Sequence, residues 1–167
     1  MKKIIIIGSG GAGKSTLARE LGHKMDLPVY HLDALLWKPQ WEMTSREEQV
    51  MIQEDLFKKE SWIIDGNYGG TLEKRIAESD TIIFIDRPRL VCIYQILKRY
   101  RQYKHTSRPD MQQDCPEKLD FVFIKWVWNF PDNQRIDILK QLSLVKQSKN
   151  VITLRNNKEI ELFLASL

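Results

Sequence analysis

One glycine-rich run near the amino terminus constrains the fold of this chain more than any other feature. Gly8-Ser9-Gly10-Gly11-Ala12-Gly13-Lys14-Ser15 fits the pattern G-x-x-x-x-G-K-[ST]. An apolar stretch, residues 3–7, precedes the run, and residues 14–25 follow it with apolar side chains at helical spacing. The pattern therefore predicts a phosphate-binding loop between a buried parallel strand and a helix.

The chemistry of such a loop explains its residue types. Glycines let the backbone curl so that successive N–H groups point at phosphate oxygens, and the start of the following helix adds its positive dipole end. We expect Lys14 to reach the β- and γ-phosphates of ATP and Ser15 to ligate Mg²⁺. The predicted nucleotide-binding residues of the loop are Gly8, Gly10, Gly11, Ala12, Gly13, Lys14 and Ser15.

The same glycines also fit a second pattern. Gly8, Gly10 and Gly13 match the G-x-G-x-x-G fingerprint of dinucleotide-binding proteins. Asp33 follows about 20 residues later, where that fingerprint needs a ribose-binding acid. An NAD-binding Rossmann site is therefore an alternative, although Lys14-Ser15 has no role in it and 167 residues leave little room for a second half.

Along the rest of the chain, short β-branched runs alternate with helical stretches, which is typical of a parallel sheet covered by helices. Residues 121–128 fit either a strand or a helix, and we predict a helix that Pro131 kinks or divides. The length and the lack of linkers predict one α/β domain over residues 1–167. The predicted strands are residues 3–7, 29–32, 62–65, 81–86 and 151–154, and the predicted helices are residues 14–25, 88 to about 103 and 159–167, with others opened by the Ser45–Glu48 capping box and by Pro116.

Composition bounds the function classes. The net charge of +4 does not by itself indicate nucleic acid or membrane. The apolar run after Lys3 is shorter than the 7–15 residues, roughly, of an export signal, and no stretch approaches the ~20 apolar residues of a membrane span. Cys92 and Cys115 lack metal-site spacing. We expect a cytoplasmic monomer or homodimer with reduced thiols.

Two predicted strands end in an aspartate that could hold Mg²⁺ together with Ser15. Asp65 is followed by Gly66, which leaves space beside a phosphate. Asp86 is followed by Arg87 and Pro88, which favours a helix cap or an ion pair. We therefore predict Asp65 as the metal-binding acid.

Residues 87–108 carry basic side chains and no acidic one. Such a run is typical of a solvated helix face, of a nucleic-acid patch with interleaved tyrosines, or of a lid that closes over phosphates. We predict a lid at about residues 104–116 with Arg108 as its catalytic arginine. The sequence leaves open which of Arg101, Arg108 and Arg135 contacts phosphate.

The predicted acceptor-binding segment is about residues 33–60. Asp33 could accept the proton of an acceptor hydroxyl. Trp37 and Trp41 could stack on a planar acceptor or serve only in packing, and Arg46 could anchor an anion. The identity of the acceptor stays open.

With these residues in place, the chain resembles P-loop small-molecule kinases related to adenylate and shikimate kinase, and most closely bacterial topology modulation proteins. The matching pieces are residues 8–16, 31–33 with Trp37 and Trp41, 62–68 and 84–88. The resemblance implies a three-layer sandwich with a five-stranded parallel sheet in order 2-3-1-4-5 and a small lid. It also implies Thr16 near the α-phosphate, Arg99 against the adenine or the phosphates, and Arg155 beside the base.

The sequence as a whole predicts a phosphotransferase that moves the γ-phosphoryl group of Mg·ATP to a small-molecule acceptor. Its predicted catalytic residues are Lys14, Asp33, Arg99 and Arg108. The alternative is a nucleotide-regulated DNA-binding protein that uses the basic face of residues 87–108.

Overall fold

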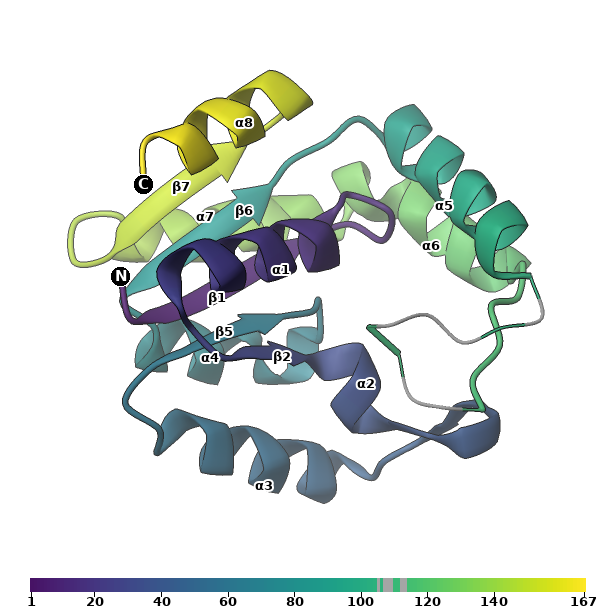
Figure 1. Ribbon diagram of the computed structural model, residues 1–167, viewed down its shortest axis with the longest axis horizontal. Coiled ribbons are helices and arrows are strands. Elements are labelled where there is room, and N and C mark those ends of the chain that lie inside the picture. Colours follow the sequence, from purple (N-terminus) through teal and green to yellow (C-terminus); the bar gives the residue numbers. More distant parts are fainter. Residues whose placement is uncertain (105, 107–109, 112–113) are drawn as a thin grey trace.

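The fold is built on a five-stranded parallel sheet (Figure 1). The computed structural model describes residues 1–104, 106, 110–111 and 114–167. Strand β1 (Lys3–Gly8) lies between β5 (Trp62–Asp65) and β6 (Thr81–Ile85), while β2 (Val29–His31) and β7 (Asn150–Leu154) form the edges. Counted along the chain, the strands of this sheet follow the order 2-3-1-4-5, which confirms the predicted topology.

The apolar side chains of β1 alternate between the two faces of the sheet, and each face is covered by helices. Ile4 and Ile6 pack toward α1 (Lys14–Met25) and α8 (Asn157–Ala165). Ile5 and Ile7 pack toward α4 (Leu72–Glu78) and α7 (Gln134–Val145) on the opposite face (Figure 1). A strand buried on both faces can be apolar throughout, and the three layers follow from that.

The strand order excludes the Rossmann alternative. In that fold the second strand pairs with the first. Here β5 lies between β1 and β2, with Ile5 paired to Ile64 and Tyr30 paired to Ile64 on its other side. Asp33 therefore follows an edge strand rather than the direct neighbour of the glycine loop.

The predicted helix over residues 121–128 is confirmed, but the helix predicted to begin at Pro116 is wrong. Helix α6 (Phe121–Asn129) begins later, because the Asp120 side chain accepts hydrogen bonds from the N–H groups of Val122 and Phe123 at its first turn. Pro131 lies in a short 3₁₀ turn (Phe130–Asp132) that separates α6 from α7, as predicted.

Several short elements were not predicted. The second strand ends at His31, and the chain turns at once into α2 (Leu32–Leu36) and then into a hairpin of β3 (Trp37–Lys38) and β4 (Glu42–Met43). These pieces are too short to show a period. The 3₁₀ turn of the hairpin (Pro39–Trp41), the 3₁₀ turn before α4 (Gly69–Thr71) and α4 itself were also missed.

The remaining helices match their sequence signals. Helix α3 (Arg46–Phe57) opens with the predicted capping box, in which the Ser45 side chain accepts from the Glu48 N–H and the Glu48 carboxylate accepts from the Ser45 N–H. Helix α5 (Arg89–Tyr103) follows Pro88. Over the described residues, no helix combines the length and the apolar character that crossing a bilayer needs.

The described part of the predicted lid is joined to the β3–β4 hairpin. The Gln40 N–H donates to the Asp114 carbonyl at 3.1 Å, and the Trp41 indole donates to the Pro116 carbonyl at 3.2 Å. The buried Cys115 thiol lies 3.2 Å from the Lys38 carbonyl, and both Cys92 and Cys115 are free. Parts of the predicted acceptor segment and of the predicted lid therefore share one surface.

A buried arginine fixes the loop after β5. Arg75 of α4 has no exposed surface and donates to the carbonyls of Gly66 and Tyr68 at 2.7 and 2.8 Å. Burial lowers the pKa of its guanidinium to about 10. The Tyr68 carbonyl also accepts from the Thr71 N–H at 3.2 Å. Among the described residues, the buried Gly66 carbonyl is therefore the one that depends on Arg75.

We expect Arg75→Met to lower the free energy of unfolding by about 1–3 kcal/mol, because it leaves the buried Gly66 carbonyl unpaired. Arg101→Met, at an exposed position of α5, should change it by less than about 0.5 kcal/mol. Urea denaturation of the two variants measures the difference. Equal stability of both variants would show that the Gly66 carbonyl finds another donor.

Candidate functional site

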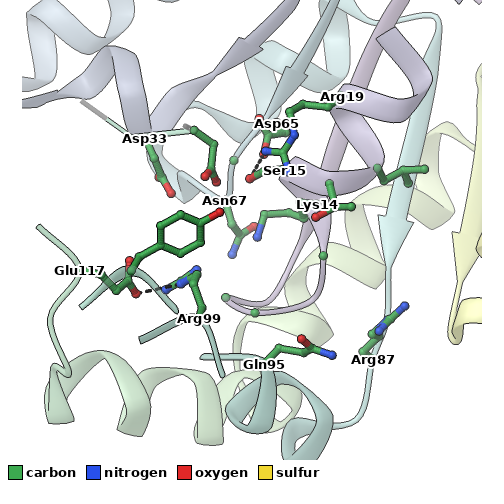
Figure 2. Close-up of a pocket in the computed structure, with 18 of the residues that line it drawn as sticks. Lys14, Ser15, Arg19, Asp33, Asp65, Asn67, Arg87, Gln95, Arg99 and Glu117 are labelled. Atoms are coloured by element: carbon green, nitrogen blue, oxygen red, sulfur yellow. Dashed lines mark hydrogen bonds and ion pairs between the residues drawn. The ribbon is translucent and has the colours of Figure 1, made fainter. Parts of the chain in front are cut away.

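A cavity of about 820 Å³ lies at the carboxyl edge of the sheet (Figure 2). The glycine loop, the start of α1 and the end of β5 form its middle. Asp33 and Arg87 lie at opposite ends of it in Figure 2, with Ser15 and Asp65 between them. In open α/β sheets, ligands bind at this edge.

The glycine loop has the backbone shape that a phosphate needs. Gly13 caps α1 with a left-handed φ of 99°, and nothing lies within 4 Å of the place where a Cβ would stand. The first turn of α1 has no acidic residue. At Gly13 an anion can therefore approach the helix start without meeting a Cβ, and no acidic residue of the first turn of α1 repels it.

The other side of the loop is packed tightly against the protein. A Cβ on Gly11 would lie 2.3 Å from the Cys92 carbonyl oxygen of α5, and a Cβ on Gly8 would lie 2.5 Å from the Ile85 carbonyl oxygen. Ala12 is fully buried beneath the loop. Of the predicted nucleotide-binding residues at this end of α1, the following line the cavity: Gly10, Gly11, Gly13, Lys14, Ser15 and Thr16.

Lys14 lies at the cavity with its ammonium group in contact with the loop. Its Nζ donates to the Ser9 carbonyl at 2.8 Å. Desolvation lowers the pKa of this lysine, and the charges of Asp33 and Asp65 partly offset that effect. The electrostatic attraction between an ammonium group and a phosphate is stronger where the ammonium group is desolvated than where it is solvated.

Ser15 and Asp65 form the pair that the sequence predicts for Mg²⁺. The Ser15 hydroxyl donates to Asp65 Oδ2 at 2.9 Å, and Asp65 is buried at the end of β5. A hydroxyl and a carboxylate beside a phosphate site are hard oxygen ligands that suit Mg²⁺. The residues present therefore fit this metal.

His31 contacts the second oxygen of the same carboxylate. Its Nδ1 lies against Asp65 Oδ1. Burial acts to lower the pKa of His31, but the hydrogen bond and charge of Asp65 outweigh it, so the pKa is raised. From the sequence alone, His31 is expected to pack in its strand rather than to act as a catalytic base, and the contact with Asp65 was not predicted. The place of His31 at the end of β2 puts it beside the end of β5.

Asp33 faces the cavity from α2 and is held by a tyrosine. The Tyr68 hydroxyl donates to Asp33 Oδ1 at 2.7 Å. Burial and the neighbouring Asp33 charge raise the pKa of Tyr68 well above its ordinary value. The tyrosine is therefore a fixed donor that orients the carboxylate.

Helix α5 forms a polar side of the cavity, where the sequence alone indicated only a basic run. Gln95, Lys98 and Gln102 line the cavity from one helix face, which their spacing could have shown. Arg99 also lines it and donates through Nε to Glu117 at 2.8 Å. Tyr103 lines the same side of the cavity.

The basic residues of this run do not share one outer face. Arg87, Lys98 and Arg99 line the cavity, whereas Arg89 pairs with Asp132 at 2.9 Å. Arg101 is exposed and is absent from the described lining. Arg108 lies outside the described residues.

Arg135 and Arg155 are not among the described residues that line the cavity. Arg135 binds Asp86 through two hydrogen bonds of 2.7 and 2.9 Å. The expected ion pair of Asp86 is present, with Arg135 as its partner instead of Arg87. Arg155 is exposed in the turn before α8. Helix α8 itself lines the cavity through Asn157, Ile160, Glu161 and Leu164.

Solved structures share this fold at low sequence identity. A shikimate kinase from Acinetobacter baumannii in complex with shikimate has 15% identity and a TM-score of 0.57, over 99% of this chain and 90% of that one. A gluconokinase from Sinorhizobium meliloti 1021 has 13% identity and a TM-score of 0.55, over 99% of this chain and 92% of that one. A shikimate kinase from Bacteroides thetaiotaomicron has 15% identity and a TM-score of 0.52, over 98% of this chain and 94% of that one.

The sequence itself matches no protein-family model and no curated protein. The structural likeness shows the fold of small-molecule P-loop kinases. Nothing in it supports the narrower resemblance to topology modulation proteins, which stays a prediction.

The His31–Asp65 contact should make stability depend on pH in Mg²⁺-free buffer. Because the pKa of His31 is raised from 6.5, the ion pair contributes fully below about pH 6.5 and is lost as pH rises through the raised value. The destabilisation caused by His31→Gln should therefore be larger at about pH 6 than at about pH 9. Urea denaturation at both pH values measures it, and equal destabilisation would contradict the ion pair.

Proposed function

We propose that this protein is an ATP-dependent phosphotransferase that transfers the γ-phosphoryl group of Mg·ATP to the hydroxyl group of a small-molecule acceptor. One observation carries the proposal. The open glycine loop, Lys14 and the Ser15–Asp65 pair adjoin one cavity, and that cavity continues past them to a second carboxylate, Asp33. A site that only bound nucleotide would not need the part of the cavity that reaches Asp33.

The chemical roles follow from the positions of the side chains. ATP would place its phosphates on the loop at the helix start, near Thr16 and Lys14, with its base toward the end lined by Arg87, Asn157 and Leu164. Mg²⁺, held by Ser15 and Asp65, would neutralise phosphate charge when bound. The predicted place of Arg155 beside the base belongs to this proposal too.

The transfer itself needs a proton acceptor and cations. Asp33 would accept the proton of the acceptor hydroxyl as its oxygen attacks the γ-phosphorus. The bond from that phosphorus to the β–γ bridging oxygen breaks, and ADP leaves. Lys14 and Arg99 would stabilise the charge on the transferring group, and Arg108 keeps its predicted role in the lid.

The DNA-binding alternative is less well supported. It needs the basic run on an outer surface, whereas Arg87, Lys98 and Arg99 line the cavity. If the alternative holds, duplex binding should weaken steeply with salt, with a log–log slope of about −0.9 for each neutralised phosphate. Binding that does not depend on salt would remove it.

We expect Lys14→Ala to lower kcat by about 10²- to 10³-fold, because it removes a cation from the transferring phosphoryl group. Lys24→Ala, at an exposed position near the end of the same helix, should leave kcat unchanged. The measurement is ADP release from Mg·ATP with a panel of nucleosides, nucleoside monophosphates and hydroxy acids. A folded Lys14→Ala protein with full activity would refute the proposed function.

A further inference from the structure

The residues that line the cavity opposite the glycine loop indicate what kind of acceptor the site could bind. We call the following set the acceptor wall: the lining residues of α2, of the β3–β4 hairpin, of the loop after β5 and of the described residues 110–111 and 114–120. They include Asp33, Trp37, Trp41, Asn67 and Tyr68. Any acceptor class inferred from this wall rests on the proposed phosphotransferase function.

The hairpin of this wall has a strained backbone. Gln40 and Trp41 have φ values of 63° and 64°, in the left-handed region that bulky residues rarely adopt. Such strain persists only where the surroundings enforce it, and it gathers at ligand-binding sites. The Gln40–Asp114 and Trp41–Pro116 hydrogen bonds enforce it here, and Lys118 Nζ lies 4.8 Å from the centre of the Trp41 ring.

The strained hairpin presents aromatic surface to the cavity. Trp37 and Trp41 meet edge to face, with ring centres 5.6 Å apart and planes at 71°. Both side chains line the cavity and keep part of their surface exposed, and Tyr68 adds a third ring. Two rings at a steep angle offer a flat face and a neighbouring edge, which suits stacking on a planar ring.

The described lining of the wall has more acidic than basic side chains. Glu117 pairs with Arg99, and Lys118 lies over the Trp41 ring. Arg46, which could have anchored an anion, is absent from the described lining. Arg19 of α1 lines the cavity near Asp65 (Figure 2), outside this wall. The described charged side chains of the wall are Asp33, Asp110, Glu117, Lys118 and Asp120.

One hydrogen-bonding group of the wall suits a hydroxyl. Tyr68 occupies Oδ1 of Asp33, and no described residue donates to Oδ2. A hydroxyl that donated to Oδ2 would have its oxygen placed for attack and its proton acceptor in contact. The amide side chain of Asn67 lies between Asp33 and Lys14 in Figure 2, where it can hydrogen bond to polar atoms of the acceptor.

We propose that the acceptor is an uncharged, nucleoside-like compound whose planar ring stacks on Trp37 and Trp41 and whose hydroxyl group donates to Asp33. In the transfer, the acceptor oxygen forms a bond to the γ-phosphorus and gives its proton to Asp33. The bond from that phosphorus to the leaving oxygen of ADP breaks. The products are a phosphorylated acceptor and ADP, with no further reactant.

The test compares acceptors that differ only in charge. Adenosine, guanosine, cytidine and uridine are each assayed against their 5′-monophosphates, with shikimate and gluconate as anionic hydroxy acids. Mass spectrometry identifies the phosphorylated product. We expect at least one nucleoside to exceed its monophosphate and both hydroxy acids in kcat/KM by about tenfold or more, since the monophosphate faces the carboxylates of the wall. Preference for a monophosphate or a hydroxy acid would overturn the inference.

Variants of the wall separate stacking from structural support. Trp37→Leu should raise the KM of the nucleoside about tenfold or more, without changing the KM of ATP, and Trp37→Phe should restore most of the loss. Asp33→Asn should lower kcat by about 10²-fold or more with little change in the nucleoside KM. Thermal unfolding checks that each variant is folded. Equal changes in both KM values would overturn the stacking role.

The failure of this inference differs from the failure of the proposed function. ATP turnover that needs Lys14 but phosphorylates no nucleoside overturns the inference and leaves the phosphotransferase in place, whether the phosphoryl group goes to an anion or to water. No Lys14-dependent turnover with any compound of the panel refutes both.

Discussion

The hydrogen bond between Ser15 and Asp65 joins the two parts of the molecule on which the site depends. Ser15 stands on the first turn of α1, and Asp65 ends β5, so the 2.9 Å contact exists only because β5 is the direct neighbour of β1. The same strand pairing places β2 one strand further out. Asp33 therefore faces the loop across the cavity instead of lying beside it.

Behind this contact, a chain of hydrogen bonds connects the buried Arg75 to the far side of the cavity. Arg75 holds the carbonyls of Gly66 and Tyr68, and the Tyr68 side chain holds Asp33. Arg75 pairs the buried Gly66 carbonyl, and the partly buried Tyr68 orients a carboxylate that lines the cavity. The position of the Asp33 carboxylate is thus tied to a guanidinium on α4, a helix that packs on the opposite face of the sheet from α1.

Beyond α5, the stretch of residues 114–118 supports the aromatic side of the cavity by a different kind of contact. It contacts the β3–β4 hairpin through backbone carbonyls, at Asp114 and Pro116, rather than through apolar packing alone. These bonds hold Gln40 and Trp41 in backbone conformations that neither residue prefers. This stretch therefore helps to fix the position from which Trp41 lines the cavity.

The sequence by itself determined the features that local chemistry dictates. The glycine loop, the Ser45–Glu48 capping box and the role of Pro131 as a helix divider follow from backbone freedom and short-range hydrogen bonds. The apolar strands gave the sheet, and the Asp at the end of β5 could be paired with Ser15 because the P-loop pattern requires such an acid.

Only the tertiary structure decided the partners of the long polar side chains and the course of the short elements. Asp86 pairs with Arg135, Arg99 with Glu117, and Tyr68 with Asp33. These pairs span 18 to 49 residues of sequence, and a flexible side chain has many partners within reach until packing excludes all but one. The hairpin at Trp37 and Trp41 was missed for the same reason, since its strained backbone is imposed by contacts with residues 114–118 rather than by its own sequence.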